Sequence, residues 1–106
     1  KALGGSAPAP SKELTLGGPD IAENGAVVPV ALSSSLQGIR RLLLLVEKNP
    51  AMLSAVFELG DGVEPDLRLN LKMAQSSNVY LVAMMADGRV LYTAREIKIT
   101  IGSCGA

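Results

Sequence analysis

Residues 79–101 read VYLVAMMADGRVLYTAREIKITI, and this stretch decides the fold class. Its first part contains two runs rich in apolar residues, Val79–Met85 and Arg89–Ala94, which are separated by Ala86-Asp87-Gly88. Asp-Gly supplies the positive φ angles that a tight turn between two strands needs. The stretch therefore predicts an antiparallel β-hairpin.

Two further segments alternate apolar and polar residues, as a strand with one buried and one solvated face does. The end of the same stretch, Ile97–Ile101, reads IKITI, and an earlier segment, Leu67–Met73, reads LRLNLKM. A period of two is typical of a half-buried strand rather than of a helix. The C-terminal half of the chain therefore predicts a series of β-strands.

The N-terminal half adds three candidate strands. Ala26–Leu32 contains Pro29, which has no backbone N–H to donate to a neighbouring strand and therefore indicates a sheet edge or a bulge. Ile39–Lys48 contains four consecutive leucines and is compatible with a helix or a strand, and we favour a strand because turn residues bound it closely on both sides. Ala51–Leu59 predicts a further short strand.

Together these segments predict an all-β protein, an immunoglobulin-like two-sheet antiparallel β-sandwich of about seven short strands. We expect three parts along the chain. Residues 1–12 form a flexible N-terminal lead-in of mostly Gly, Ala, Ser and Pro, and residues 13–101 form the sandwich domain. Residues 102–106 form a mobile, Gly-rich C-terminal arm.

The composition of the 106-residue chain excludes many functions. Its 10 basic and 10 acidic residues balance, so no net field attracts a phosphate backbone or an anionic membrane, and we expect neither nucleic acid nor membrane as a partner. The longest apolar run, Val79–Ala86, is far shorter than the roughly 20 residues that cross a bilayer. With no His and one Cys, the chain cannot assemble a Ser-His-Asp triad, an internal disulfide or a thiolate metal cluster.

The single cysteine, Cys104, is the one candidate for chemistry. We expect a solvated thiol on a thin arm, about 10 Å beyond Ile101, which can enter a narrow pocket of another protein. The nearest basic residue in the sequence is Lys98, so we expect an accessible thiol that is not activated by its own chain. The four residues around the cysteine are small and form the expected flexible arm: Gly102, Ser103, Gly105 and Ala106.

The remaining candidate residues indicate structure rather than chemistry. Met73, Met84 and Met85 predict core or interface packing, since no His or second Cys accompanies them as a metal ligand. We therefore expect no catalytic residue, no metal site and no cofactor in this chain. Acidic residues beside Gly or Pro predict turns and lack the spacing of a calcium loop: Asp20, Glu23, Asp61, Glu64, Asp66 and Asp87.

Several parts of the chain together resemble one protein family. They are the segment Ile21–Val30 (IAENGAVVPV), the step Glu47-Lys48-Asn49-Pro50, the Asp87-Gly88 hairpin and a last strand that runs into a Gly-rich tail with a cysteine. With these features, the chain from about Leu14 onwards resembles the SoxY subunit of the bacterial thiosulfate-oxidising carrier. The early segment and the tail are specific in combination.

The tail of that family is Gly-Gly-Cys-Gly-Gly, so Cys104 takes the position of the carrier cysteine, and Gly102 and Gly105 match. Ser103 and Ala106 replace glycines of the pattern. The resemblance therefore implies that Cys104 holds sulfur intermediates covalently and presents them to partner enzymes. It implies a sulfur carrier protein of thiosulfate oxidation and not an enzyme.

The resemblance also implies the setting and the partners. The carrier would be periplasmic and paired with a SoxZ-type subunit, with self-association as the alternative. A c-type cytochrome would join thiosulfate to the thiol, a sulfate-releasing hydrolase would remove the terminal sulfone, and in some organisms a sulfane dehydrogenase would oxidise the remaining sulfur. The chain begins at Lys1 without the features of a signal or transit peptide, so we expect a processed or trimmed chain.

Two other functions stay open at the level of sequence. One is a structural or interaction β-sandwich module whose Cys104 only forms intermolecular disulfides. The other is a domain of an enzyme complex in which the tail is incidental. Sulfur adducts on Cys104 would separate the carrier from both.

Overall fold

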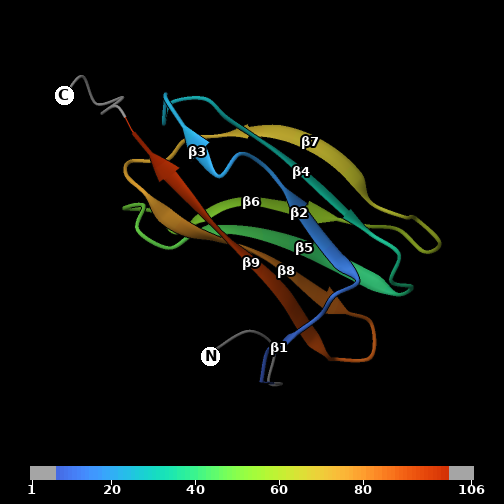
Figure 1. Cartoon of the computed structure of the whole chain (residues 1–106). Helices are drawn as coiled ribbons and strands as arrows, with labels where there is room; N and C mark the ends of the chain where they lie inside the picture. Colours follow the sequence, from blue (N-terminus) through green and yellow to red (C-terminus); the bar gives the residue numbers. More distant parts are fainter. Residues whose placement is uncertain (1–6, 101–106) are drawn as a thin grey trace.

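The computed structural model describes residues 7–100, and within this range it contains nine β-strands and no helix (Figure 1). It thus contains no helix there that is long and apolar enough to span a membrane. The strands, in chain order, are β1 (Ala9–Pro10), β2 (Leu14–Gly17), β3 (Ile21–Ala22), β4 (Val28–Ser34), β5 (Ile39–Val46), β6 (Leu53–Glu58), β7 (Asp66–Leu71), β8 (Ser77–Met85) and β9 (Val90–Ile99).

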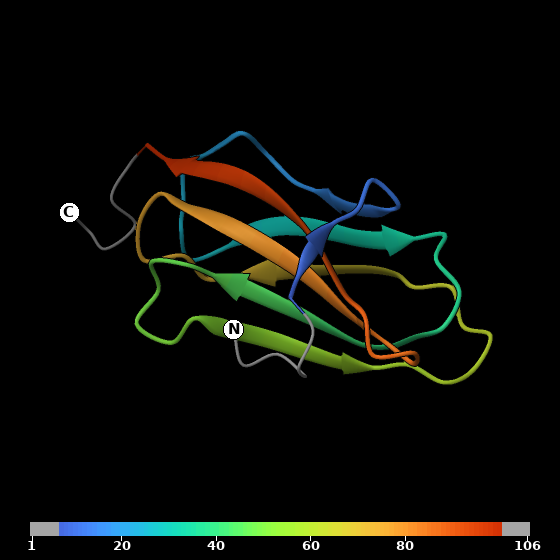
Figure 2. The ribbon, with the colours of Figure 1, turned by 90° about the horizontal axis from the view of Figure 1, so that it is seen from below.

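The strands form two layers, which Figure 2 shows from a second direction. The larger sheet has the order β1-β9-β8-β5-β6, with β3 also beside β9, and the smaller sheet has the order β2-β4-β7. All pairings are antiparallel except those of the two-residue strands β1 and β3, which run parallel to β9. The predicted two-sheet antiparallel β-sandwich is therefore confirmed, with two short parallel pairs as exceptions.

The hydrophobic core lies between the two sheets and takes its residues from both. Val28 and Leu32 enter it from the smaller sheet, and Leu44, Leu81 and Ile97 enter it from the larger one, each with essentially no exposed surface. Burial of a side chain of this size stabilises a fold by about 1.5–3 kcal/mol. Two of the three methionines that were predicted to pack, Met73 and Met85, are also buried in this core.

Strand β5 shows why its four leucines have no diagnostic period. Leu42 and Leu44 face the core, whereas Leu43 and Leu45 lie on the outer face of the larger sheet. There they join an apolar group that we call the outer cluster. Because β5 lies between β8 and β6, with the core on one face and the outer cluster on the other, every position from 42 to 45 is apolar, and the preference for a strand is confirmed. The outer cluster consists of Leu43, Leu45, Tyr80, Val82, Met84, Val90 and Tyr92.

Pro29 lies in the middle strand of the smaller sheet, so the expectation that its strand forms a sheet edge is wrong. Strand β4 pairs with both β2 and β7. However, β2 pairs with β4 only as far as Gly17 opposite Ala31, so Pro29 has Asn70 of β7 on one side and no strand on the other. The missing N–H of Pro29 is tolerated because of this local gap.

Part of the segment expected as a flexible lead-in is a strand. Ala9–Pro10 pairs in parallel with Leu91 and Tyr92, and the Ser11 amide donates to the Tyr92 carbonyl oxygen over 2.9 Å. The outer edge of β9 offers unpaired backbone groups, and these two residues satisfy some of them. The ordered sheet therefore begins before the expected start of the domain at residue 13.

Candidate functional site

The residues predicted to carry the chemistry lie beyond the part of the chain that the structure describes. They are Cys104 and its neighbours Gly102, Ser103, Gly105 and Ala106. What the structure shows is the end of the sandwich from which they continue. Strand β9 ends at Ile99, and the next amide, of Thr100, donates to the carbonyl oxygen of Ala22 over 3.0 Å. Cys104 is four residues beyond this anchored amide.

Three loops surround the last residues of β9. They are residues 23–27 between β3 and β4, residues 47–52 between β5 and β6, and residues 72–76 between β7 and β8. Figure 1 shows these loops at the end of the sandwich to which the arrow of β9 points. We call the surface formed by these loops, by β3 and by the last residues of β9 the β9 end.

Asn49 joins two of these loops. Its amide nitrogen Nδ2 donates to the Lys72 carbonyl oxygen over 2.7 Å, and its Oδ1 accepts from the Ala74 amide over 2.9 Å. Both bonds cross between loops that are far apart in the sequence. Asn49 therefore holds the 47–52 loop against the 72–76 loop.

Two serines at the start of β8 make the remaining connections. The hydroxyl of Ser76 accepts from the Ile99 amide over 2.8 Å, which fixes the end of β9 against the 72–76 loop. The hydroxyl of Ser77 accepts from the Lys48 amide over 3.0 Å and donates to the Asn78 carbonyl oxygen over 2.9 Å. Among the residues that the structure describes, Ser77 is the one buried polar residue, and those two bonds satisfy its hydroxyl group.

The sequence analysis did not assign these roles to Asn49, Ser76 and Ser77. In the sequence, Asn49-Pro50 marks the end of a predicted strand and is part of the step that resembles the family. A signal was present, because Asn and Ser side chains next to strand ends commonly bond to backbone groups. The partners of those bonds lie in other loops, however, and they follow from the tertiary structure alone.

Exposed charges at the β9 end have mixed sign. Glu47 and Lys48 lie on one loop, Lys72 lies on another, and Glu96 and Lys98 lie near the end of β9. Neighbouring charges of opposite sign produce little long-range field. This end of the molecule therefore offers no strong electrostatic attraction for an anion or for a charged partner.

Two of the six acidic residues that were predicted to form turns contact arginines, and a third, Asp66, is instead the first residue of strand β7. Asp87 accepts from the Arg89 amide over 3.0 Å and from the Arg89 Nε over 2.8 Å, and these contacts, the backbone one first, hold the pKa of Asp87 below its ordinary value. Asp20 instead pairs with Arg95 over 3.0 Å. Within residues 7–100 no group of three or more acidic, His or Cys side chains could hold a metal ion.

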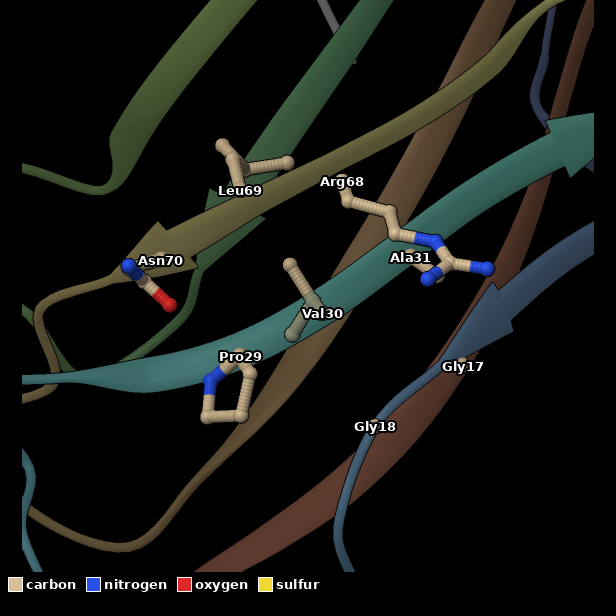
Figure 3. Close-up of a pocket in the computed structure, with 8 residues that line it drawn as sticks. All are labelled: Gly17, Gly18, Pro29, Val30, Ala31, Arg68, Leu69 and Asn70. Carbon is tan, nitrogen blue, oxygen red and sulfur yellow. The ribbon is translucent and has the colours of Figure 1, made fainter.

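A groove on the smaller sheet does not supply a catalytic site. Figure 3 shows it where β2 ends beside β4. The groove has a volume of about 410 Å³. Its one charged side chain belongs to Arg68, and it contains no pairing of a nucleophile with a base, which covalent catalysis requires. The groove is lined by Gly17, Gly18, Pro29, Val30, Ala31, Arg68, Leu69 and Asn70.

Comparison with protein families decides the relationship of the chain. The profile of the family described as "Sulfur oxidation protein SoxY" matches residues 1–104. The chain belongs to the SoxY family. The resemblance predicted from the sequence is therefore confirmed, and the match extends as far as Cys104. Among curated protein sequences no match was found.

Solved structures agree with the SoxY assignment. The chain is 29% identical to the sulfur carrier protein SoxY from Chlorobium limicola f thiosulfatophilum, with 93% of this chain and 89% of that chain covered and a TM-score of 0.85. A superoxide reductase (neelaredoxin) from Ignicoccus hospitalis is 19% identical, with 82% of this chain and 80% of that chain covered and a TM-score of 0.72. This second similarity is one of fold alone.

Proposed function

We propose that the protein is a sulfur carrier of thiosulfate oxidation and that Cys104 holds the sulfur intermediates covalently. The observation that carries the proposal is the SoxY match, which includes the single cysteine of the chain. The solved SoxY structure that covers most of this chain is described as a sulfur carrier protein. Because Cys104 is four residues beyond Thr100, whose amide is anchored to Ala22, its thiol can be presented away from the sandwich.

The first step of the proposed cycle joins thiosulfate to the thiol. A bond forms between Sγ of Cys104 and the terminal sulfur of thiosulfate, the thiol proton leaves to water, and two electrons pass to a c-type cytochrome. The product is a cysteine S-thiosulfonate. Attack of a thiolate requires deprotonation, and the small residues around Cys104 provide no base, so the partner protein supplies this activation.

The second step releases sulfate. A sulfate-releasing hydrolase adds water across the bond between the sulfur that is attached to Sγ of Cys104 and the sulfone group. This hydrolysis gives sulfate and leaves a cysteine persulfide, without a net change in oxidation state. Where a sulfane dehydrogenase is present, it oxidises the outer sulfur of the persulfide to a sulfonate, with oxygen from three waters, and the six electrons pass through the dehydrogenase to a cytochrome acceptor. A second hydrolysis then releases this group as sulfate and restores the Cys104 thiol. The carrier itself contributes the thiol and its position.

The outer cluster supports the proposed association with a SoxZ-type subunit. The cluster lies on three strands, β5, β8 and β9. Three strands at about 4.8 Å spacing, and three rows of outward side chains at about 6.8 Å, span roughly 300 Å². A standard interface buries about 800 Å² on each partner, with an apolar centre and a polar rim. The outer cluster has the size of such a centre, and self-association through it is the alternative. We further propose that the complex works in the periplasm.

Reconstitution with purified partners tests the proposal. Thiosulfate and the c-type cytochrome are added to the complex of the chain with its SoxZ-type subunit, and reduction of the cytochrome is measured by absorbance. We expect two electrons for each Cys104 thiol, no reduction with Cys104→Ser, and normal reduction with the matched variant Ser103→Ala. Equal reduction with Cys104→Ser would refute the covalent role.

A further inference from the structure

Strand β6 is a free edge of the larger sheet. It pairs with β5 on one side, and in the described part of the chain no strand pairs with its other side. Figure 2 shows β6, in light green, at one margin of the molecule. The opposite edge of this sheet, that of β9, is covered at both ends by the short strands β1 and β3. A free edge presents unpaired backbone N–H and C=O groups, which are a template for a further strand.

The hydrogen bonds of β6 show which of its backbone groups face outward. The Leu59 amide donates to the carbonyl oxygen of Arg40 in β5 over 2.9 Å. In an antiparallel pair the bonded residues alternate along each strand, so Phe57 also bonds towards β5. Val56 and Glu58 therefore point their N–H and C=O groups away from the sheet. A register shift near the start of β6 interrupts the ladder, so the regular edge lies in the second half of the strand.

The side chains along this edge are mostly apolar. Val56 is 44% exposed on the outer face, and Ala55 and Phe57 are only partly buried against the core on the inner face. The one charged residue of β6 is Glu58, which pairs with Arg41 of its own chain over 2.8 Å. By contrast, β7, an edge of the smaller sheet, alternates leucines with charged or polar residues. Charged side chains discourage pairing at an edge, so β6 is the edge that favours a further strand.

We propose that two copies of this chain associate edge to edge through β6, as an antiparallel pair with a two-fold axis at Phe57. In this register, Val56 of each copy lies opposite Glu58 of the other, and each such pair of residues exchanges both N–H···O bonds. Charge selects this register, because a pair centred on Glu58 would place two carboxylates opposite each other. A pair centred on Val56 would extend into the register shift at the start of β6.

A second copy fits this edge because the association closes. With the β9 edge covered by β1 and β3, a two-fold pair uses the free edge of both larger sheets in the described part of the chain, and growth stops at two copies. The two outer clusters then lie on the same face of one continuous sheet. The two β9 ends point in opposite directions, so this pair is distinct from a dimer linked through Cys104. The contact is smaller than a standard interface of about 1,600 Å², and we expect a weak dimer with a Kd of about 0.1 mM.

Amide hydrogen exchange of the full chain, measured at two concentrations, tests the pair. Reductant is present, so that disulfides do not contribute. The amides of Val56 and Glu58 should exchange about fourfold more slowly at about 1 mM chain than at about 10 µM, as expected for a Kd of about 0.1 mM. The matched control is the Asn70 amide on the free edge of β7, which should exchange at the same rate at both concentrations.

Two variants at one position test the register by sedimentation equilibrium at low salt. Val56→Lys places an ammonium group opposite each Glu58 of the other copy, whereas Val56→Glu places a carboxylate there. We expect the Kd of the dimer to fall about fivefold with Val56→Lys and to rise about fivefold with Val56→Glu. High salt should reduce this difference.

Three outcomes would overturn the pair. They are equal Kd values for the two variants, exchange at Val56 that does not depend on concentration, and protection of Val56 and Glu58 only after a SoxZ-type subunit is added. The last outcome would assign the β6 edge to that subunit. None of them bears on the proposed role of Cys104, because the pair involves no residue of the C-terminal segment.

Discussion

Replacement of Asn49 by Ala is expected to loosen the β9 end. The variant removes two hydrogen bonds, the 2.7 Å bond to the Lys72 carbonyl oxygen and the 2.9 Å bond from the Ala74 amide. A hydrogen bond contributes about 0.5–1.5 kcal/mol net, and water can reach both groups, so we expect a loss of about 1.5 kcal/mol in the free energy of unfolding. In a domain of this size, that loss lowers the thermal midpoint by about 6–12 °C.

The assay combines thermal unfolding, followed by circular dichroism, with amide hydrogen exchange. We expect faster exchange at Ala74 in the Asn49→Ala variant, because its amide loses its acceptor there. Asn49→Asp is the matched control, since it keeps the acceptor for Ala74 but loses the donor to Lys72, and its Ala74 amide should stay protected. A thermal midpoint of Asn49→Ala within about 1 °C of the wild type, with unchanged exchange at Ala74, would refute the reasoning.

Three further predictions concern the hairpin and the outer face. Gly88 has a φ of +92°, so Gly88→Ala should lower the free energy of unfolding by about 1 kcal/mol in urea titrations. Because Arg89 lowers the pKa of Asp87, the ionised carboxylate stabilises the fold above the ordinary carboxyl pKa, and this contribution disappears as the pH falls through the lowered pKa. In thermal melts over the acid range, the thermal midpoint should therefore fall less for Asp87→Asn than for the wild type. An equal fall in the two midpoints would contradict the stabilising role of the Asp87 carboxylate. Val56 is 44% exposed and lies opposite Leu43 of the outer cluster. Val56→Glu should therefore weaken binding of the SoxZ-type subunit about tenfold, as measured by calorimetry, and leave the thermal midpoint of the chain unchanged. An unchanged affinity would show that the subunit binds at another surface.

The fold was predictable where local pattern and tertiary environment agree. Ile97 is fully buried and its neighbours Glu96 and Lys98 are exposed, as alternation predicts. Ala86-Asp87-Gly88 forms the expected turn, although only Gly88 of these residues has a positive φ, and the Gly88 amide closes the turn by donating to the Met85 carbonyl oxygen over 3.0 Å. Such local signals account for the strands of the C-terminal half.

Prediction was less successful where a strand depends on a distant partner. Pro29 lies in a middle strand, and the gap that tolerates it exists only because β2 stops pairing at Gly17. The strands β1 and β3 are two residues long and have no pattern of their own, since they form by pairing with the free edge of β9. The position of such an edge is a property of the assembled sheet.

The candidate site was predictable in one respect and not in another. Cys104 follows from sequence alone, because the composition leaves no other group for covalent chemistry and its neighbours resemble a known tail, and its role stays a prediction. The arrangement of the β9 end was not predictable, because Asn49 and Ser76 act on backbone groups more than twenty residues away. Such contacts depend on how the loops meet in three dimensions.

Intact mass spectrometry shows whether Cys104 carries sulfur. The protein is purified from its source during thiosulfate oxidation, without reductant, and its mass is compared with that of Cys104→Ala. We expect adducts of one or more sulfur atoms, or a thiosulfonate, on the wild-type chain and none on the variant. A wild-type spectrum with only free thiol and disulfide-linked dimer would contradict it.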